Sequence, residues 1–338
     1  MQTQQTYTQN TQTPLVSFII TTYNLPKEYL AECLRSILQL SLNPREREVI
    51  LVDDGSDMAA ISELLDYQDD IIYLRQCNQG LSIARNRGLQ IATGKYIQFV
   101  DGDDYLIQVS YEHCLDLVRY HNPDIVHFNF TNTKVEKDIP YQYSEPISGS
   151  IYLHNNNLCA AAWSYVFKSK LLQNLRFTPN ILHEDEEFTP LLFLKAERII
   201  TTDTKAYFYR KRGNSIIHED NKRHNLKRLA DTEQVIYHLQ TKSNYLPENE
   251  RIALNRRIAQ LTMDYLYNSI VLTRSNKHLE ETIKRLHNKG LFPLPEKKYT
   301  KKYLMFAKAI NSKIGRKLML ITWPNKAFRQ AFPAFLPG

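Results

Sequence analysis

Short apolar runs rich in β-branched residues recur along the first third of the chain, separated by segments with helical spacing. The runs predict buried strands at residues 15–22, 47–52, 71–74 and 95–100. Between them, Pro26 opens a segment whose apolar positions recur at helical spacing, and residues 81–92 form another helical segment that closes at Gly94. This repetition of strand and helix predicts an α/β fold with a Rossmann-like, mostly parallel sheet flanked by helices.

The pattern changes after residue 104. The expected elements are a helix at 111–121, a strand at 124–130, a loop or hairpin at 134–153, a helix-compatible stretch at 157–175, a helix at 183–195 and a strand at 198–209. From about residue 221 the pattern is helical, with breaks near Pro247 and at Pro293–Pro295. Residues 1–13 are rich in Gln and Thr and are predicted to be a disordered lead-in rather than a signal peptide.

The chain therefore divides into two predicted regions after the lead-in. Residues 14–220 are expected to form the α/β domain, with halves at 14–110 and 111–220, and residues 221–338 a basic helical region. Residues 1–220 contain 20 Lys and Arg against 28 Asp and Glu, whereas residues 221–338 contain 23 against 8. The positive second region suits a phosphate-rich partner, either an anionic membrane or a nucleic acid.

Composition argues against two other features. No run of about 18 apolar residues occurs, so no membrane-spanning helix is predicted. None of the four cysteines belongs to a Cys-x-x-Cys pair, so a zinc site is not expected. They are predicted to be reduced, mostly buried thiols of a cytosolic protein.

Polar clusters follow three of the predicted strands, at Thr21–Asn24, Asp53–Ser56 and Asp101–Asp104. Because ligands bind outside the carboxyl ends of parallel strands, these clusters are expected to share one rim. A buried strand that ends in clustered carboxylates is costly unless a cation lies there. Since Mg²⁺ takes one or two carboxylates and completes its shell with phosphate oxygens and water, the third cluster predicts a metal–diphosphate site.

Two of these clusters suggest particular chemistry. Asp101-Gly102-Asp103 is an Asp-x-Asp motif, for which we predict ribose and metal binding; the alternative is an acidic turn that caps a helix. Asp54 can accept the imide N–H of a uracil ring, or it can belong to an ordinary turn and helix cap. The two motifs together favour a nucleotide site.

Three arginines are candidates for the same site. Arg85, on the helix at 81–92, is expected to reach a nucleotide phosphate or to pair with an Asp on the rim. Arg210 and Arg212 follow a strand and are expected to cover the diphosphate, the alternative being that they are simply exposed.

Residues 183–187 contain four consecutive carboxylates after His183. Asp185 is the predicted general base, because like charges nearby can raise a carboxyl pKa toward neutrality, and Glu184 is its supporting or substitute residue. Glu186 and Glu187 are explained by the preference of helix N-termini for negative charge. Trp163 is either a core residue or an aromatic platform for the acceptor sugar.

The residues at 16–24, 49–56, 78–88 and 96–104, together with Glu184-Asp185, resemble the family-2 glycosyltransferases, which have a GT-A fold. The likeness covers roughly residues 14–215. It includes residues 207–216, which look like a Tyr-x-Tyr-Arg-x-Arg-x-x-Ser-Ile segment common in bacterial members. Gly102 stands where many members carry Ser.

The resemblance implies an inverting transfer of a hexosyl or N-acetylhexosaminyl group from a nucleoside-diphosphate sugar, expected to be a UDP-sugar. The acceptor would be a glycan or glycolipid hydroxyl in bacterial surface-polysaccharide or lipid-linked glycan synthesis. By position, Thr22, Tyr23 and Asp54 would contact the base, Arg85 would help hold the nucleotide, Asp101 would contact ribose, Asp103 would bind Mg²⁺ or Mn²⁺, and Asp185 would deprotonate the acceptor. Residues 14–110 would be the nucleotide-sugar-binding half and residues 111–220 the acceptor-binding half.

Two other functions compete with this one. A sugar nucleotidyltransferase also needs carboxylates and Mg²⁺, but it usually has a Gly-rich, basic phosphate loop near the N-terminus, which Thr21–Pro26 lacks. A nucleic-acid-binding protein is suggested by the pI of 9.0. Its positive charge, however, lies almost wholly after residue 220 while the motifs lie before it, so no nucleic-acid partner is expected.

The basic tail, for example residues 301–308, mixes lysines with apolar residues. This composition suits peripheral contact with the anionic inner face of the cytoplasmic membrane. The alternative is a solvated helical cap over the catalytic domain, and otherwise the protein is expected to be cytoplasmic.

Overall fold

The structure, a computed structural model, describes residues 13–133, 141–211 and 222–322. The chain divides into two compact units, which are described separately. Unit 1 comprises Met1–Glu145, Trp163–Asn174 and Ile200–Arg210, and unit 2 comprises Pro146–Ala162, Leu175–Ile199 and Lys211–Gly338.

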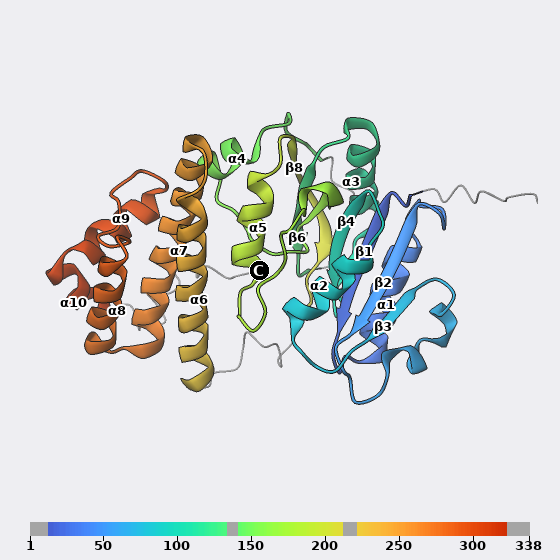
Figure 1. Cartoon of the computed structure of the whole chain (residues 1–338), viewed down its shortest axis with the longest axis horizontal. Coiled ribbons are helices and arrows are strands. Elements are labelled where there is room, and N and C mark those ends of the chain that lie inside the picture. The colour runs from blue at the N-terminus through green and yellow to red at the C-terminus, as the bar shows by residue number, and fades with distance from the viewer. Residues whose placement is uncertain (1–12, 134–140, 212–221, 323–338) are drawn as a thin grey trace, which may run out of the picture. The chain divides into compact units, whose positions relative to one another are not determined.

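Unit 1 is built on a sheet with the strand order β3-β2-β1-β4-β7-β6-β8-β5 (Figure 1). The strands are β1 (Val16–Thr22), β2 (Arg47–Asp53), β3 (Ile72–Arg75), β4 (Tyr96–Asp101), β5 (Tyr105–Leu106), β6 (Ile125–Thr131), β7 (Tyr165–Lys168) and β8 (Ile199–Phe208). The neighbours β3, β2, β1 and β4 pair in parallel, whereas β4–β7, β7–β6 and β8–β5 are antiparallel. The predicted α/β class is confirmed, and its parallel part is the half formed by the first 101 residues.

Burial explains why the first strands read as continuous apolar runs. β1 and β4 have neighbours on both edges, and most of their side chains are buried. Strands buried on both faces of a parallel sheet lack the alternating pattern of half-exposed strands. The helices of this unit are α1 (Lys27–Leu38), α2 (Leu81–Ile91) and α3 (Gln108–His121), with short 3₁₀ turns η1 (Ala60–Glu63), η2 (Leu65–Tyr67) and η3 (Ser169–Leu171). The predicted helices after Pro26 and at 81–92 are confirmed.

Unit 2 is helical in its described part. Its helices are α4 (Gly149–Asn155), α5 (Asp185–Leu194), α6 (Lys222–Ser243), α7 (Glu248–Thr273), α8 (Asn276–Asn288), α9 (Lys301–Asn311) and α10 (Lys313–Thr322). The long helices α6 and α7 run side by side (Figure 1). An apolar core that includes Leu239, Leu254, Leu266 and Leu279 joins α6, α7 and α8. The segment with four carboxylates, at the start of α5, belongs to this unit.

The helix expected over residues 157–175 is wrong. The structure has an irregular stretch there, followed by strand β7 and the turn η3. Tyr165, Val166 and Phe167 are all buried, and β7 pairs with both β4 and β6. Aromatic and β-branched residues with neighbours on both sides favour a strand, which a short apolar run cannot distinguish from a buried helix. The end of the loop or hairpin expected at 134–153 is the helix α4 instead.

The cysteines do not form disulfides: Cys33 and Cys114 are buried, Cys159 is half-buried and Cys77 is exposed. Within the described ranges, no helix has the length and apolar character needed to cross a bilayer. The predicted lead-in, apart from Thr13 at its end, and Arg212 lie outside the described residues.

Candidate active site

The carboxyl ends of β1, β2 and β4 are joined by main-chain hydrogen bonds. The N–H of Asp54 donates to the carbonyl of Thr22 at 2.9 Å, and the N–H of Gly102 donates to the carbonyl of Thr21 at 3.2 Å. The parallel register pairs Thr22 with Asp53 and Thr21 with Asp101. The expectation that these polar clusters share one rim of the sheet is therefore confirmed.

Asp53, the first carboxylate of the second cluster, is fully buried and supports the loop that follows it. Its oxygens accept hydrogen bonds from the N–H of Ser56 at 2.8 Å, the N–H of Ala60 at 3.1 Å and the hydroxyl of Tyr73 at 2.7 Å. Burial alone would raise the pKa of Asp53, but these hydrogen bonds outweigh it and lower the pKa below its usual value. Asp53 is thus a charged structural residue.

Asp54 points instead toward the loop between β3 and α2. One carboxylate oxygen accepts from the side-chain amide of Gln76 at 2.7 Å and from the N–H of Gln79 at 2.9 Å, and the other accepts from the N–H of Gly80 at 2.8 Å. Gly80 has a φ of +88°, a backbone conformation that favours glycine. Asp54 therefore holds this loop at the rim, beside the start of α2.

The two residues at the end of β1 that are expected to contact the base differ in exposure. Thr22 is buried, whereas Tyr23 is half exposed and offers an aromatic face to a ligand. The next residue, Asn24, donates its N–H to the hydroxyl of Ser56 at 2.9 Å, which fixes the two loops together.

Arg85 and Asp101 form an ion pair on the rim. The guanidinium Nη2 lies 2.9 Å from Oδ1 of Asp101. Arg85 is buried on the inner face of α2, with its guanidinium 5.8 Å from the centre of the Phe99 ring, and Asp101 keeps part of its side chain exposed. The structure therefore matches the alternative in which Arg85 pairs with an Asp of the rim.

The turn after β4 is held together by its third carboxylate. Asp104 is buried and accepts hydrogen bonds from the Tyr207 hydroxyl at 2.9 Å and the Arg210 N–H at 2.7 Å. The Tyr207 hydroxyl also accepts from the N–H of Asp101 at 3.1 Å. Burial, then repulsion from Asp101 and Asp103, raises the pKa of Asp104 to about 8. Asp104 is a structural member of the turn, and its raised pKa reflects mainly its burial.

Arg210 is placed against this turn and against α1. Its Nε donates to the carbonyl of Asp103 at 2.8 Å, and its guanidinium pairs with the carboxylate of Glu32. The guanidinium also lies 4.4 Å from the centre of the Tyr29 ring. These contacts give Arg210 a role in shaping the acidic turn, and its predicted contact with the diphosphate stays a prediction.

Gly102 is confined by its neighbours. A Cβ at this position would lie 2.9 Å from the carbonyl oxygen of Thr21 and 3.0 Å from Cδ1 of Leu25. A side chain there would require the turn to shift, so the glycine packs this turn closely against the end of β1.

Trp163 packs within unit 1. Only 4% of the residue is exposed. Its ring stacks on Tyr207 with centroids 4.4 Å apart and meets the edge of Phe130 at 5.0 Å. This burial favours the core alternative for Trp163. Because Tyr207 donates a hydrogen bond to Asp104, the stacking of Trp163 on Tyr207 also supports the turn after β4.

Glu184 and Asp185 belong to unit 2. Glu184 is buried and precedes the first residue of α5, and Asp185 begins that helix. The helix predicted at residues 183–195 is confirmed, and it spans Asp185–Leu194. Asp185, Glu186 and Glu187 occupy its first turn, where the helix dipole favours negative charge.

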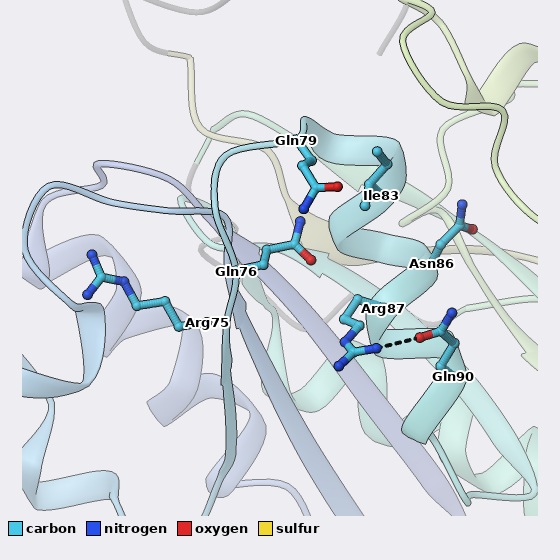
Figure 2. A pocket seen from close by; sticks show the side chains of 7 residues that line it. All are labelled: Arg75, Gln76, Gln79, Ile83, Asn86, Arg87 and Gln90. Atoms are coloured by element: carbon cyan, nitrogen blue, oxygen red, sulfur yellow. Dashed lines mark hydrogen bonds between the residues drawn. The ribbon is translucent and has the colours of Figure 1, made fainter.

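A hollow of about 340 Å³ lies on the outer face of α2. Its lining residues are Arg75, Gln76, Gln79, Ile83, Asn86, Arg87 and Gln90. Figure 2 shows Gln76 and Gln79 at one end of the hollow, and these two residues also hold Asp54. None of the predicted site residues lines the hollow, and Arg87 bonds to Gln90 at 3.0 Å.

The turn after β4 fits a divalent cation only with ligands from a substrate. Among the described residues, no group of three or more His, Cys, Asp or Glu side chains is arranged to hold a metal ion. Asp104 and one oxygen of Asp101 accept hydrogen bonds within the protein, and Asp103 lies between these two residues in the same turn. An ion that takes one or two carboxylates and completes its shell with diphosphate oxygens and water suits this donor set.

Sequence reasoning did not identify three supporting residues: Gln76, Tyr207 and Glu32. Gln76 lies just after β3 and Tyr207 in β8, yet both hold carboxylates of the rim. Tyr207 was visible as part of the 207–216 segment, but Glu32 carried no signal because its partner Arg210 is 178 positions away.

Residues 17–190 match the family described as Glycosyl transferase family 2. The chain belongs to this family. It is 32% identical over 219 residues to the uncharacterized glycosyltransferase EpsJ of Bacillus subtilis (strain 168), a match that covers 60% of this chain and 63% of EpsJ. It is 28% identical over 219 residues to glycosyltransferase GlyA of Streptococcus pneumoniae serotype 4, covering 60% of this chain and 31% of GlyA. The chain thus matches less than two thirds of the length of either relative.

Solved structures share the fold. The crystal structure of Staphylococcus aureus TarS 1–349 in complex with UDP-GlcNAc superposes with a TM-score of 0.60 at 20% identity, covering 94% of this chain and 92% of TarS 1–349. The mannosyltransferase PcManGT from Pyrobaculum calidifontis in complex with GDP-Man and Mn²⁺ gives 0.54 at 13% identity, covering 92% and 88%. These likenesses confirm the predicted GT-A fold.

Proposed function

We propose that the protein is an inverting glycosyltransferase that moves a hexosyl or N-acetylhexosaminyl group from a UDP-sugar to a hydroxyl of a glycan or glycolipid. The observation that carries the proposal is the rim on which Asp54, the Arg85–Asp101 pair and Asp103 meet. Family membership and the UDP-GlcNAc-bound neighbour TarS support it. TarS of Staphylococcus aureus is named poly(ribitol-phosphate) beta-N-acetylglucosaminyltransferase, which supports a bacterial cell-surface polymer as acceptor.

Each residue of the rim has a proposed task. Tyr23 and Thr22 contact the nucleotide base, and Asp54 fixes the loop between β3 and α2 beside it. Asp101 accepts hydrogen bonds from the ribose, and Arg85 keeps its carboxylate in place. Asp103 would hold Mg²⁺ or Mn²⁺, and such an ion offsets the charge of the diphosphate as it leaves.

Asp185 is the proposed base. It removes the proton from the acceptor hydroxyl, whose oxygen then attacks the anomeric carbon from the face opposite the diphosphate. Inversion in one displacement needs a single base and no enzyme nucleophile. Glu184, buried next to it, is the supporting residue.

Two substitutions test these roles, with exposed Asp116→Asn as the control for loss of an acidic charge. Asp185→Asn is expected to abolish transfer while UDP binding remains, and Asp103→Ala to lose both transfer and Mn²⁺-dependent binding of UDP. Thermal-shift screening of UDP-sugars with Mn²⁺ first identifies the donor, since a ligand that binds the native state raises the melting temperature. Full transfer by Asp185→Asn would reject Asp185 as the base and leave Glu184 as the candidate.

Product analysis separates the proposal from its main alternative. A glycosyltransferase releases nucleoside diphosphate, whereas a sugar nucleotidyltransferase releases pyrophosphate. Formation of pyrophosphate would therefore overturn the proposed reaction.

We also infer that α9 and α10 contact an anionic membrane surface. On α10, the apolar residues Ile314, Leu318 and Ile321 recur at helical spacing and are 74, 56 and 73% exposed. Exposed Lys313 and Lys317 lie on the same helix. Residues 297–338 contain ten Lys and Arg and no Asp or Glu. A cationic helix with an exposed apolar stripe matches a helix that lies in the membrane interface.

Vesicle flotation of the full chain tests this surface. The protein is expected to float with phosphatidylglycerol vesicles but not with phosphatidylcholine vesicles. The triple variant Ile314→Ser, Leu318→Ser and Ile321→Ser should lose this binding. Equal, negligible binding to both vesicles would overturn the inference, and a dimer that the triple variant disrupts would assign the stripe to a second copy of the chain.

A further inference from the structure

The first turn of α5, which contains several carboxylates, forms an ion pair with an arginine from another helix of the same unit. The carboxylate of Glu186 contacts the guanidinium of Arg257, which lies on α7, 71 positions later in the chain. Only 9% of the Arg257 side chain and 23% of the Glu186 side chain are exposed. An ion pair with so little water around it is weakly screened, so it influences neighbouring charges.

Asp185 is adjacent to Glu186 in the first turn of α5 and therefore lies close to this ion pair. Burial raises the pKa of Cys159, and the charges of Glu186 and Asp185 raise it further, while Arg257 lowers it. Cys159 on the preceding segment is thus influenced by the same charges.

The first turn of α5 and the residues just before it also contact α6. The Nδ1 of His238 lies 3.3 Å from Oε2 of Glu187, and the Nε of Arg228 lies 3.5 Å from Nε2 of His183. The N–H of Leu182 donates to Asp231 at 2.8 Å. The first turn of α5 is thus held between α6 and α7.

Other titratable groups complete this environment in the described part of unit 2. They are Asp264 on α7, Lys302 on α9, Tyr152 on α4, and His224 with Asp231 on α6. Burial raises the pKa of Asp264 to about 8, and the charge of Arg257 opposes this rise, while the hydrogen-bonded partner of Arg257 is Glu186. Arg257 is then the charge that balances Glu186.

We propose that Arg257 is a positioning residue for the base, pairing with Glu186 so that the first turn of α5 is fixed and the negative charge next to Asp185 is cancelled. The proposal rests on the proposed function of Asp185. Without the guanidinium, Glu186 becomes an uncompensated anion beside Asp185, which favours the protonated form of that residue. Without the Glu186 carboxylate, the guanidinium of Arg257 favours the ionised form of Asp185.

Titration of Asp185 in the full chain tests the proposal without any substrate. Protein labelled with ¹³C-carboxyl aspartate is titrated by NMR, and the Asp185 signal is identified by its loss in Asp185→Asn. Arg257→Met is expected to move the midpoint of this titration up by about one pH unit, and Glu186→Gln to move it down. The double variant should return it close to the wild-type midpoint.

Arg251→Met is the matched control, because Arg251 is an exposed arginine on the same helix. It should leave the midpoint unchanged. A merely structural role for Arg257 lowers the melting temperature without shifts of opposite sign, and that result would overturn the proposal. If Arg257→Met does not fold, Glu186→Gln alone decides: a downward shift supports the proposal and an unchanged midpoint rejects it.

Enzyme activity provides a second, independent measurement. UDP release from UDP-N-acetylglucosamine with Mn²⁺ should fall at least tenfold in Arg257→Met, and the acidic limb of kcat/KM should move in the same direction as the NMR midpoint. If Asp185→Asn keeps full activity while the NMR shifts occur, the assignment of the base has failed and the electrostatic coupling stands. If Asp185→Asn is inactive and the midpoints do not move, the role of Arg257 has failed and the base stands.

Discussion

Both units hold clusters of carboxylates next to the end of a regular element, but they balance the charge in different ways. In unit 1, Asp53 and Asp54 accept hydrogen bonds mainly from N–H groups of the loops that follow them in the chain. In unit 2, the carboxylates of Glu186 and Glu187 meet Arg257 and His238, which lie 71 and 51 positions later in the chain. The first arrangement uses mainly main-chain donors within 26 positions of the carboxylates, and the second uses side chains from helices farther away in the chain.

This difference separates recognition from support. N–H donors fixed by a turn give a carboxylate a defined direction, which suits a residue that orients a nucleotide. Side-chain cations from another helix control the charge of a segment, which suits a residue that must accept a proton. The comparison therefore predicts that changes at the rim affect donor binding, whereas changes in the helices affect proton transfer.

The largest effect is expected at the exception within unit 1, the Arg85–Asp101 ion pair. Arg85→Gln removes the cation that holds Asp101, so UDP binding in the presence of Mn²⁺ should weaken at least tenfold by calorimetry. Arg87→Gln is the matched control, because Arg87 lies two positions away on the exposed face of α2. Equal affinities for the two variants would show that Arg85 contributes only to packing.

A smaller effect is expected from Asp53→Asn, which tests whether N–H donors stabilise the rim. The amide has a single acceptor oxygen, so it cannot accept from Ser56 at one position and from Ala60 and Tyr73 at the other as the carboxylate does, and unfolding free energy should fall by about 1–3 kcal/mol at pH 7. Denaturation with urea measures this loss, and exposed Asp69→Asn is the control. Because the pKa of Asp53 is lowered in the folded state, the difference should shrink as the pH falls through that pKa. A constant difference down to pH 2 would reject the charged role.

An effect that depends on pH is expected from Asp264→Asn in unit 2. The folded state keeps Asp264 protonated up to about pH 8, whereas the unfolded chain loses that proton near pH 4. The wild-type protein therefore loses stability between these values as the pH rises, and the variant should not. Melting temperatures at pH 5 and pH 9 check this, with exposed Glu281→Gln as the control. The same pH dependence in variant and wild type would contradict the buried position of this charge.

The sequence predicted the parallel half of the fold well, because apolar runs and helical segments there are adjacent in the chain. The strands and helices up to Asp101 lie within one or two residues of their predicted positions. Strand β7 was mistaken for part of a helix, since its pairing partners β4 and β6 come from segments far from it in the chain. Long-range pairing overrides the local pattern of a four-residue run.

The site was predictable to a similar degree. The motifs placed Asp54, Arg85 and Asp101 on one rim, and the structure confirms that placement. The pattern did not distinguish Asp53, which is structural, from its neighbour Asp54, since both follow the same strand. Arg257 was not found at all, because nothing near it in the chain indicates that it meets Glu186.

The one exposed thiol, Cys77, has a practical consequence. It lies in the loop that Asp54 holds, between Gln76 and Gln79, while the other cysteines are buried or half-buried. A maleimide dye should therefore label Cys77 first, without engineering of the chain. Slower labelling in the presence of UDP would report occupancy of the neighbouring rim, so the native protein carries its own attachment point for a fluorescent binding assay.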